Sequence, residues 1–423
     1  MFSLLVFAAL ARSGSTSQST STPPNYDDPD TPEILTCSNN PPGPLRPLTH
    51  LTTCSPLIDD IKAPEIEGLV PWSYQPWCTP PNDANSKLCA FTVSSLRGGQ
   101  GMSIVTTPTV AANIANNLQD PDISWLERER GERLAADPTK PYIIKQVPGK
   151  GLGVIATRPI PEDTVIMVGL PLMMQITDSR KWPTRKVFET LQHASMRLPM
   201  AEKQRLLNMA HKGKGYIVDD IMKTNTFQVT VDRVEHSGLY PEIARINHAC
   251  KPNCYVRYSP RTLAVEAVVY KDIAEGEELS LSYIPMNFLT AQRKEFLENW
   301  GFNCTCSLCT DKEASHHSDH NRQRIQEVLE SLDYPDNQTH EKVKAAIMEV
   351  EDLVKQEALE GQLGDFNSIV AELYLDMGDF KLAREHGEVA LKMLRKYAGF
   401  DNVRTDAAVE FLEKLRKRET ERK

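Results

Sequence analysis

Residues 245–254 read Arg-Ile-Asn-His-Ala-Cys-Lys-Pro-Asn-Cys, a concentration of polar and sulfur-bearing side chains that does not suit a plain core strand. Ile246 is apolar, and the side chains that follow it have strong hydrogen-bonding capacity. Pro252 and Asn253 then favour a turn. Taken alone, the stretch also suits a surface loop whose Asn and His cap a nearby helix, so the rest of the chain must decide its role.

Three further motifs supply that context. The glycine-rich turn Gly149-Lys150-Gly151-Leu152-Gly153 precedes the stretch; Glu278-Leu279-Ser280-Leu281-Ser282-Tyr283 and Cys304-Thr305-Cys306-Ser307-Leu308-Cys309 follow it. In that order and at those separations, the four motifs resemble the SET domain of protein lysine methyltransferases. The resemblance is closest to the SET- and MYND-domain branch, whose pattern is Asn-His-Ser-Cys-x-Pro-Asn-Cys; here Ala249 replaces the Ser. The zinc-binding MYND finger is absent, since no Cys lies between Gly153 and Tyr240.

The resemblance implies methyl transfer from S-adenosylmethionine to the side-chain amine of a lysine in a protein or peptide substrate, with histones among the candidates. It assigns catalysis to Tyr283, whose phenolic oxygen would orient the amine and favour loss of its proton. A Tyr buried only for packing, a Gly-rich hairpin turn and a strand-edge Asn at position 225 are the simpler alternatives. The cofactor-binding residues that it implies are Lys150, Gly151, Leu152, Asn225, Asn247, His248, Tyr283 and Phe302.

The cysteine cluster predicts a metal site. Its C-x-C-x2-C spacing supplies three thiolates on a tight loop, one short of the tetrahedral set that Zn²⁺ prefers. Free or oxidised thiols are the alternative, although a disulfide within C-x-C is strained. In the family the fourth ligand is the Cys of the Asn-His-x-Cys motif, so the implied ligands are Cys250, Cys304, Cys306 and Cys309. Cys254 is interpreted as a small buried residue.

Composition bounds the partners and the compartment. The formal net charge of −9 argues against general nucleic-acid binding, which needs a basic surface. The apolar run Met1–Leu10 is similar to the core of a secretory signal but is too short to span a bilayer, and no other stretch predicts a membrane span. Behind such a leader, Cys37, Cys54, Cys78 and Cys89 predict two disulfides of open pairing, whereas thiolate metal ligands need reduced sulfur. The compartment therefore stays open between a nuclear or cytoplasmic and a secretory location.

The length of 423 residues predicts about two or three domains. The resemblance implies an α+β fold, in which a β-rich SET domain with a threaded, pseudoknot-like C-terminal segment precedes an all-α region. We expect a monomer. The predicted parts are a signal-like or disordered leader (1–20), a disordered segment (21–48), a small Cys-containing region (49–135), the SET domain (140–285) with a helical insert near 182–211, a post-SET zinc-binding segment (286–312) and a C-terminal helical domain (320–423).

Local patterns predict individual elements. Strands are expected at 142–147, 165–168, 224–229 and 279–283, and helices at 182–211 and 291–300. The helix pair Phe366–Met377 and Phe380–Tyr397 resembles one tetratricopeptide repeat. His193 and His211 are expected to be solvated helix residues. The histidine-rich Ser315–His320 could hold a metal but favours a solvated linker, and Lys414–Lys423 a frayed tail.

Two other functional readings remain. The first is a catalytically inactive interaction protein that keeps the SET scaffold and binds partners through its helical tail. The second is a secreted disulfide protein without metal. Methylation of lysine peptides by labelled S-adenosylmethionine separates the enzyme from the first alternative, and zinc content separates it from the second.

Overall fold

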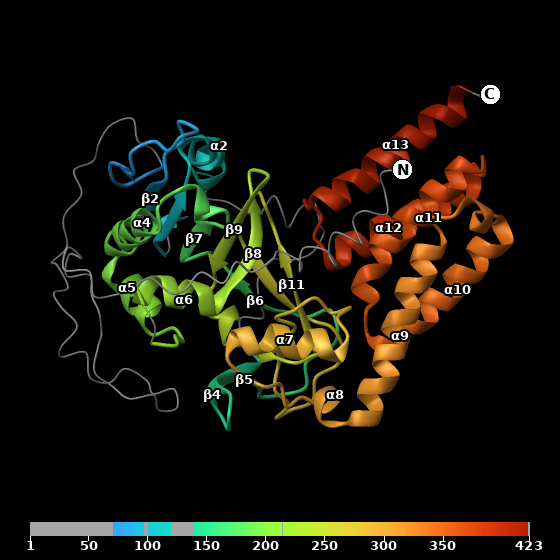
Figure 1. Ribbon diagram of the computed structural model, residues 1–423, viewed down its shortest axis with the longest axis horizontal. Helices are drawn as coiled ribbons and strands as arrows, with labels where there is room; N and C mark the ends of the chain where they lie inside the picture. The colour runs from blue at the N-terminus through green and yellow to red at the C-terminus, as the bar shows by residue number, and fades with distance from the viewer. Residues whose placement is uncertain (1–70, 97–99, 120–138, 214, 422–423) are drawn as a thin grey trace. The chain divides into compact units, whose positions relative to one another are not determined.

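The computed structural model describes residues 71–96, 100–119, 139–213 and 215–421 (Figure 1). The chain divides into two compact units. We call Asp27–Asn247 with Tyr258–Leu279 the sheet unit, and Met1–Tyr26 and His248–Arg257 with Ser280–Lys423 the helical unit. The predicted leader and disordered segment lie outside the described residues, as do Cys37 and Cys54.

A six-stranded sheet organises the described part of the sheet unit. β3 runs parallel to β7, and the other neighbouring strands are antiparallel. A disulfide joins Cys78 to Cys89, which lie opposite each other on paired strands. Of the four N-terminal cysteines, these two fall within the described residues. In order across the sheet, the strands are β1 (Trp77–Cys78), β2 (Cys89–Val93), β3 (Met102–Thr106), β7 (Met173–Ile176), β9 (Val234–Leu239) and β8 (Thr226–Val231).

Helices cover this sheet where the sequence predicts a helical insert. Leu191 and Met222 pack with Trp182 and the strand residue Met173 in one buried apolar cluster. Ser103 on β3 also donates a hydrogen bond to the carbonyl of Ala194 at 2.8 Å. The helices of this unit are α2 (Pro108–Gln119), η2 (Ser179–Lys181), α4 (Thr184–Met196), α5 (Met200–Leu207), α6 (Ile217–Asn225) and η3 (Ile243–Arg245).

The predicted glycine turn joins two paired strands, β4 (Tyr142–Val147) and β5 (Gly151–Ala156). Residues 277–279, at the end of the sheet unit's second segment, lie beside β5. The Leu279 N–H donates to the Val154 carbonyl at 2.8 Å, and the Ala156 N–H donates to the Glu277 carbonyl at 2.9 Å. These bonds place Glu278 beside the glycine turn. In another small sheet of the chain, β6 (Val165–Gly169) pairs with β12 (Val265–Val269).

Short strands lie at three of the points where the chain passes from one unit to the other. β10 (Asn247–His248) and β11 (Cys254–Tyr258) each span a boundary, and β13 (Ser280–Leu281) begins the long segment of the helical unit. Within the helical unit the Ala249 N–H donates to the Leu281 carbonyl at 2.9 Å. The strand predicted over 279–283 is therefore shorter than expected, because the chain leaves the extended conformation after Leu281.

The helical unit contains most of the C-terminal half of the chain. The predicted pair is confirmed as α11 (Leu363–Asp376) and α12 (Phe380–Tyr397), with Gly378 supplying the left-handed φ of 79° at the turn. The buried Arg322 pairs with Glu357 at 3.0 Å and donates to the carbonyls of Met286 and Phe288. The remaining helices are α7 (Thr290–Trp300), α8 (Ser307–Thr310), α9 (Lys312–Ser331), η4 (Pro335–Asn337), α10 (His340–Glu357), η5 (Glu360–Gln362) and α13 (Val403–Glu421).

Two polar segments are more regular than the sequence predicts. The expected linker Ser315–His320 belongs to α9. Asp311 caps that helix by accepting the N–H groups of Glu313 and Ala314, and the burial of Ser315 offsets its weak helix propensity. The expected frayed tail is wrong as well: α13 continues to Glu421, held by the buried Leu415.

Two expectations in the sheet unit are also corrected. The strand predicted from Thr224 begins only at Thr226, because α6 runs through Asn225. His193 is not a solvated residue: its ring stacks on Trp77 with centroids 4.3 Å apart, and burial lowers its pKa. No helix within the described ranges is long and apolar enough to cross a membrane.

Candidate functional site

In the sheet unit, one carboxylate joins the glycine turn to Asn247. The Glu278 carboxylate accepts a hydrogen bond from the Asn247 amide at 2.9 Å. It also forms an ion pair with Lys150 at 2.7 Å. The same amide nitrogen lies 3.2 Å from the Leu152 carbonyl. Asn247 and Lys150, predicted from motifs far apart in the sequence, are thus held together by Glu278.

Gly153 packs tightly against the side chains of Asn247 and Glu278, whose interactions with each other and with Lys150 we call the Glu278 clamp. A Cβ added to Gly153 would lie 2.6 Å from Val147 Cγ2, 2.7 Å from Asn247 Nδ2 and 3.0 Å from Glu278 Oε1. These distances are below ordinary van der Waals contact. Gly151, at the start of β5, has a φ of 76°, which favours glycine for a different reason. The turn's glycines therefore serve both close packing and backbone conformation.

Gly153→Ala is expected to lower the free energy of unfolding by about 1–3 kcal/mol, because the added methyl group must displace the Asn247 amide and the Val147 side chain. Denaturant unfolding measures the change. Gly361→Ala is the matched control, since a Cβ there would meet the Tyr397 ring at an ordinary 3.8 Å. Equal stability of the Gly153→Ala variant and the parent chain would contradict the clamp.

In the helical unit, the His248 ring connects Tyr283 to Cys250. His248 Nδ1 lies 3.1 Å from the Tyr283 backbone nitrogen, and Nε2 lies 3.3 Å from Cys250 Sγ. The backbone N–H can only donate, so Nδ1 accepts; the neutral ring then carries its hydrogen on Nε2 and donates it to the sulfur. The buried imidazole therefore fixes the Tyr283 backbone relative to the cysteine cluster.

Aromatic rings surround Tyr283. The Trp300 ring lies 5.2 Å from the Tyr283 ring between centroids, and Phe302 meets it edge-on at 6.4 Å. Gly301 makes this arrangement possible by ending α7 in the left-handed conformation, with φ of 87°. Phe302 remains 37% exposed, so it keeps surface that a ligand can cover.

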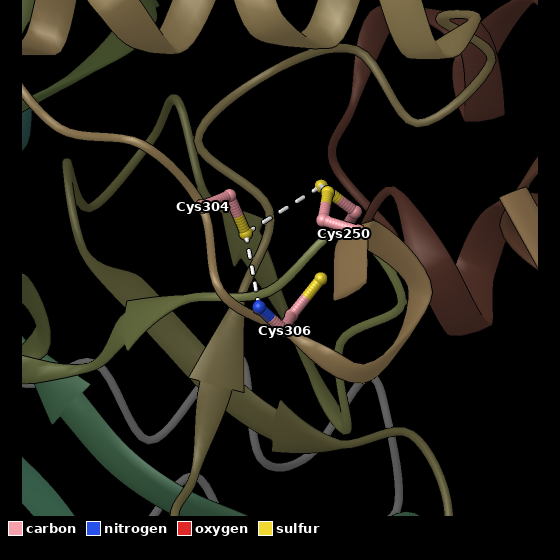
Figure 2. Close-up of side chains that lie close together, drawn as sticks. Cys250, Cys304 and Cys306 are labelled. Carbon is pink, nitrogen blue, oxygen red and sulfur yellow. Dashed lines mark hydrogen bonds between the residues drawn. The ribbon is translucent and has the colours of Figure 1, made fainter. Parts of the chain in front are cut away.

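The four predicted cysteine ligands come together. Cys250 Sγ lies 3.9 Å from Cys304 Sγ and 3.4 Å from Cys309 Sγ, and all four sulfurs, including that of Cys306, lie within 4.8 Å of one another. Figure 2 shows the labelled side chains of Cys250, Cys304 and Cys306 converging on one small space. These separations are too long for disulfides and fit the edge of about 3.8 Å that Zn–S bonds of about 2.3 Å give a tetrahedron.

The electrostatics of the cluster also favour a cation. The hydrogen bond to Cys304 is the largest cause that raises the pKa of Cys250 well above that of an ordinary thiol. The hydrogen bond from Cys250 is the largest cause that lowers the pKa of Cys309, to about 7. The thiols thus cannot all ionise alone, because each thiolate depends on a protonated neighbour. A bound Zn²⁺ would remove that conflict by stabilising four thiolates.

The predicted site residues divide between the units. Lys150, Gly151, Leu152, Asn225 and Asn247 belong to the sheet unit; His248, Tyr283, Phe302 and the four cysteines belong to the helical unit. Asn225 is the last residue of α6, and its amide nitrogen donates to the carbonyls of Ala210 and Ile221, both at 2.7 Å. Both amide hydrogens of Asn225 are therefore already satisfied by backbone.

Sequence reasoning missed two residues of these arrangements. Glu278 is the first residue of the motif that ends at Tyr283, but nothing in its local sequence indicates that it would contact Asn247 and Lys150. Trp300 is the last residue of the helix predicted at 291–300, and the sequence analysis gives it no role in the site. The adjacent Gly301 is the signal that could have found it, because a glycine after a helix indicates a sharp reversal of the chain.

Residues 151–284 match the SET domain family. The chain is 28% identical over 176 residues to the "Histone-lysine N-methyltransferase set5" of Schizosaccharomyces pombe, which covers 41% of this chain and 52% of that protein. It is 41% identical over 91 residues to the "N-lysine methyltransferase SMYD2-B" of Danio rerio, which covers 21% of this chain and 20% of that protein. It is 39% identical over 80 residues to the human "Histone-lysine N-methyltransferase SMYD3", 18% of each chain. The chain thus spans about half of the first relative and about a fifth of the others.

Proposed function

We propose that this chain, whose residues 151–284 are a SET domain similar to those of SET5 and SMYD lysine methyltransferases, transfers a methyl group from S-adenosylmethionine to a lysine side chain of a protein substrate. The observation that carries the proposal is the His248 bridge. One buried imidazole joins Tyr283, the implied catalytic residue, to Cys250, the implied metal ligand. The motif that ends at Tyr283 and the motif that contains Cys250, which the sequence relates only through the family resemblance, are in contact through this ring.

The cofactor, when bound, supplies the activated methyl group, so the protein mainly has to align the reactants and receive a neutral amine. We assign the glycine turn, with Lys150, Gly151 and Leu152, to cofactor contacts through its main chain. Asn247 and His248 hold the adenine and ribose end largely through backbone, because their side chains serve the Glu278 clamp and the Tyr283–Cys250 bridge. Phe302 covers the adenine face, and Asn225 contributes through groups other than its amide hydrogens.

Tyr283 acts on the lysine amine. Its phenolic oxygen accepts a hydrogen bond from the amine N–H, which leaves the lone pair free to point at the methyl group, and it favours the neutral form that can attack. The ring contacts to Trp300 and Phe302 limit how the phenol can tilt. Tyr283 thus orients the amine and favours its neutral form, and this chemistry requires no carboxylate pair or metal-bound nucleophile.

Cys250, Cys304, Cys306 and Cys309 hold a structural Zn²⁺ in this proposal. Four thiolates would occupy all four coordination positions of a tetrahedral Zn²⁺, which would leave no open position for substrate. Its function is to tie the segment that carries His248 to the chain beyond α7. The N–H that His248 donates to Cys250 orients that ligand, as groups behind metal ligands commonly do.

We further propose the finer architecture that the SET resemblance implies. The segment through Tyr283 is threaded under the loop around Asn247, and residues 286–312 form a post-SET zinc loop. The pair α11 and α12 is similar to a tetratricopeptide repeat and belongs to a C-terminal domain that contacts the substrate protein. The hydrogen bond from the Ala249 N–H to the Leu281 carbonyl supports the first point, because it places these two segments side by side.

The test is a pair of measurements on the zinc-loaded full chain. Calorimetry with S-adenosylmethionine is expected to show saturable binding, and methyl-labelled cofactor is expected to label a panel of lysine peptides and histones. Cofactor binding with no transfer to any protein lysine would instead identify a catalytically inactive scaffold. Absence of both would contradict the proposed function.

A further inference from the structure

Three histidines and a glutamate share one face at the start of α9. His316 and His320 are four residues apart, His317 and His320 are three apart, and Glu313 precedes His317 by four. Residues at these spacings lie on the same side of a helix with Cβ atoms about 5–6 Å apart. The segment's helical structure creates this alignment, which an extended linker would not have.

These side chains are open to solvent. Glu313, His316, His317 and His320 are all exposed. Together with Lys312 and Ala314 they border one open pocket of about 670 Å³ on the surface of the helical unit. Among the interactions of the described residues, no hydrogen bond or ion pair engages the side chains of the three histidines. Their rings can therefore turn toward a common ligand without breaking an existing contact.

We propose that this face, which we call the α9 histidine face (Glu313, His316, His317, His320), binds a divalent transition-metal ion of the Zn²⁺, Ni²⁺ or Cu²⁺ class. Imidazole nitrogens are preferred donors for these ions, and two histidines four residues apart on a helix can chelate one ion. His316 and His320 form the chelating pair, and His317 or the Glu313 carboxylate completes three protein donors. Water fills the remaining position, because the face is open.

This site is separate from the cysteine cluster. The four cysteine sulfurs already converge within 4.8 Å and provide a complete tetrahedral donor set. α9 begins two residues after α8 ends, so the two donor sets follow each other along the chain (Figure 1) without sharing a residue. Their chemistry differs as well: one offers buried or half-buried sulfur, and the other offers exposed nitrogen and oxygen.

The experiment titrates Ni²⁺ into the zinc-loaded full chain by calorimetry, with elemental analysis before and after to show that the zinc content is unchanged. One equivalent of Ni²⁺ is expected to bind. The His316→Ala and His320→Ala variants are each expected to weaken binding by about tenfold or more, since each removes half of the chelating pair. His340→Ala is the matched control, because His340 is an exposed helix residue whose ring faces Asp379 instead; its affinity for Ni²⁺ is expected to equal that of the parent chain.

The substituted positions are solvent-facing, so circular dichroism and thermal unfolding are expected to match the parent chain. Absence of saturable Ni²⁺ binding to the parent chain would overturn the proposal. Unchanged affinity in a His316→Ala/His320→Ala double variant would overturn it as well. Neither result depends on methyl transfer, so the proposed function and this metal site can fail separately.

Discussion

Tyr283→Phe is expected to lower the rate of methyl transfer by at least about 100-fold, because it removes the oxygen that orients the lysine amine and favours its neutral form. The phenyl ring keeps its contacts with Trp300 and Phe302, and the backbone N–H that bonds to His248 is unchanged. The affinity for S-adenosylmethionine is therefore expected to stay within about twofold of the parent chain. Single-turnover rates and calorimetry measure the two effects separately.

Tyr255→Phe is the matched control for this result. Tyr255 also lies in the helical unit, and its hydroxyl donates to the Lys396 carbonyl at 3.3 Å. The substitution removes that hydrogen bond and no proposed catalytic group, so methyl transfer is expected to persist. Turnover by Tyr283→Phe at the parent rate would remove Tyr283 from the mechanism.

Cys250→Ser is expected to reduce the zinc content from one ion per chain to almost none. Structural Zn²⁺ contributes on the order of 10–16 kcal/mol to folding in small zinc-binding peptides, and much of that depends on a complete thiolate set. Loss of the ion separates the segment with His248 from the loop with Cys304 and Cys309, which its sulfur now contacts at 3.9 and 3.4 Å. Cofactor binding and methyl transfer are therefore expected to fall together, and the thermal unfolding temperature with them.

Cys254→Ser is the control that tests whether loss of zinc is specific to Cys250 or follows the replacement of any nearby cysteine. Cys254 is buried, with 1% of its surface exposed, but it is not among the four converging sulfurs. Its replacement is expected to preserve the zinc content while costing some packing energy. Elemental analysis of both variants gives the result directly. Full zinc content in Cys250→Ser would show that the cluster is not a four-cysteine metal site.

Part of this site was predictable because chemically specialised residues occur in ordered motifs. The C-x-C-x2-C spacing indicates three thiolates by itself. Cys250 lies 54 residues before Cys304, and no local spacing could assign it as the fourth ligand; the SET resemblance could. Neither local spacing nor the family resemblance predicted the contacts of Glu278 with Asn247 and Lys150. These contacts depend on the return of the chain beside β5, which is a contact of the folded state.

Where local prediction failed, tertiary contacts outweighed composition. Ser315–His320 contains residues of weak helix propensity, which favoured a linker. In the structure the Ser315 hydroxyl donates to the Leu308 carbonyl at 2.6 Å, and Ser318 donates to the buried carboxylate of Glu357. These partners lie elsewhere in the helical unit, so the sequence of the segment could not reveal them. The same helix then aligns the histidines that a linker would have left apart.

The most direct measurement supplies methyl-labelled S-adenosylmethionine to the zinc-loaded full chain with an unfractionated protein extract, and analyses the hydrolysed protein for labelled amino acids. The account predicts that the label is recovered as methylated lysine, and that the Tyr283→Phe variant yields almost none under the same conditions. Label that never enters protein lysine, from a chain that carries zinc and binds the cofactor, would contradict the assignment as a protein lysine methyltransferase.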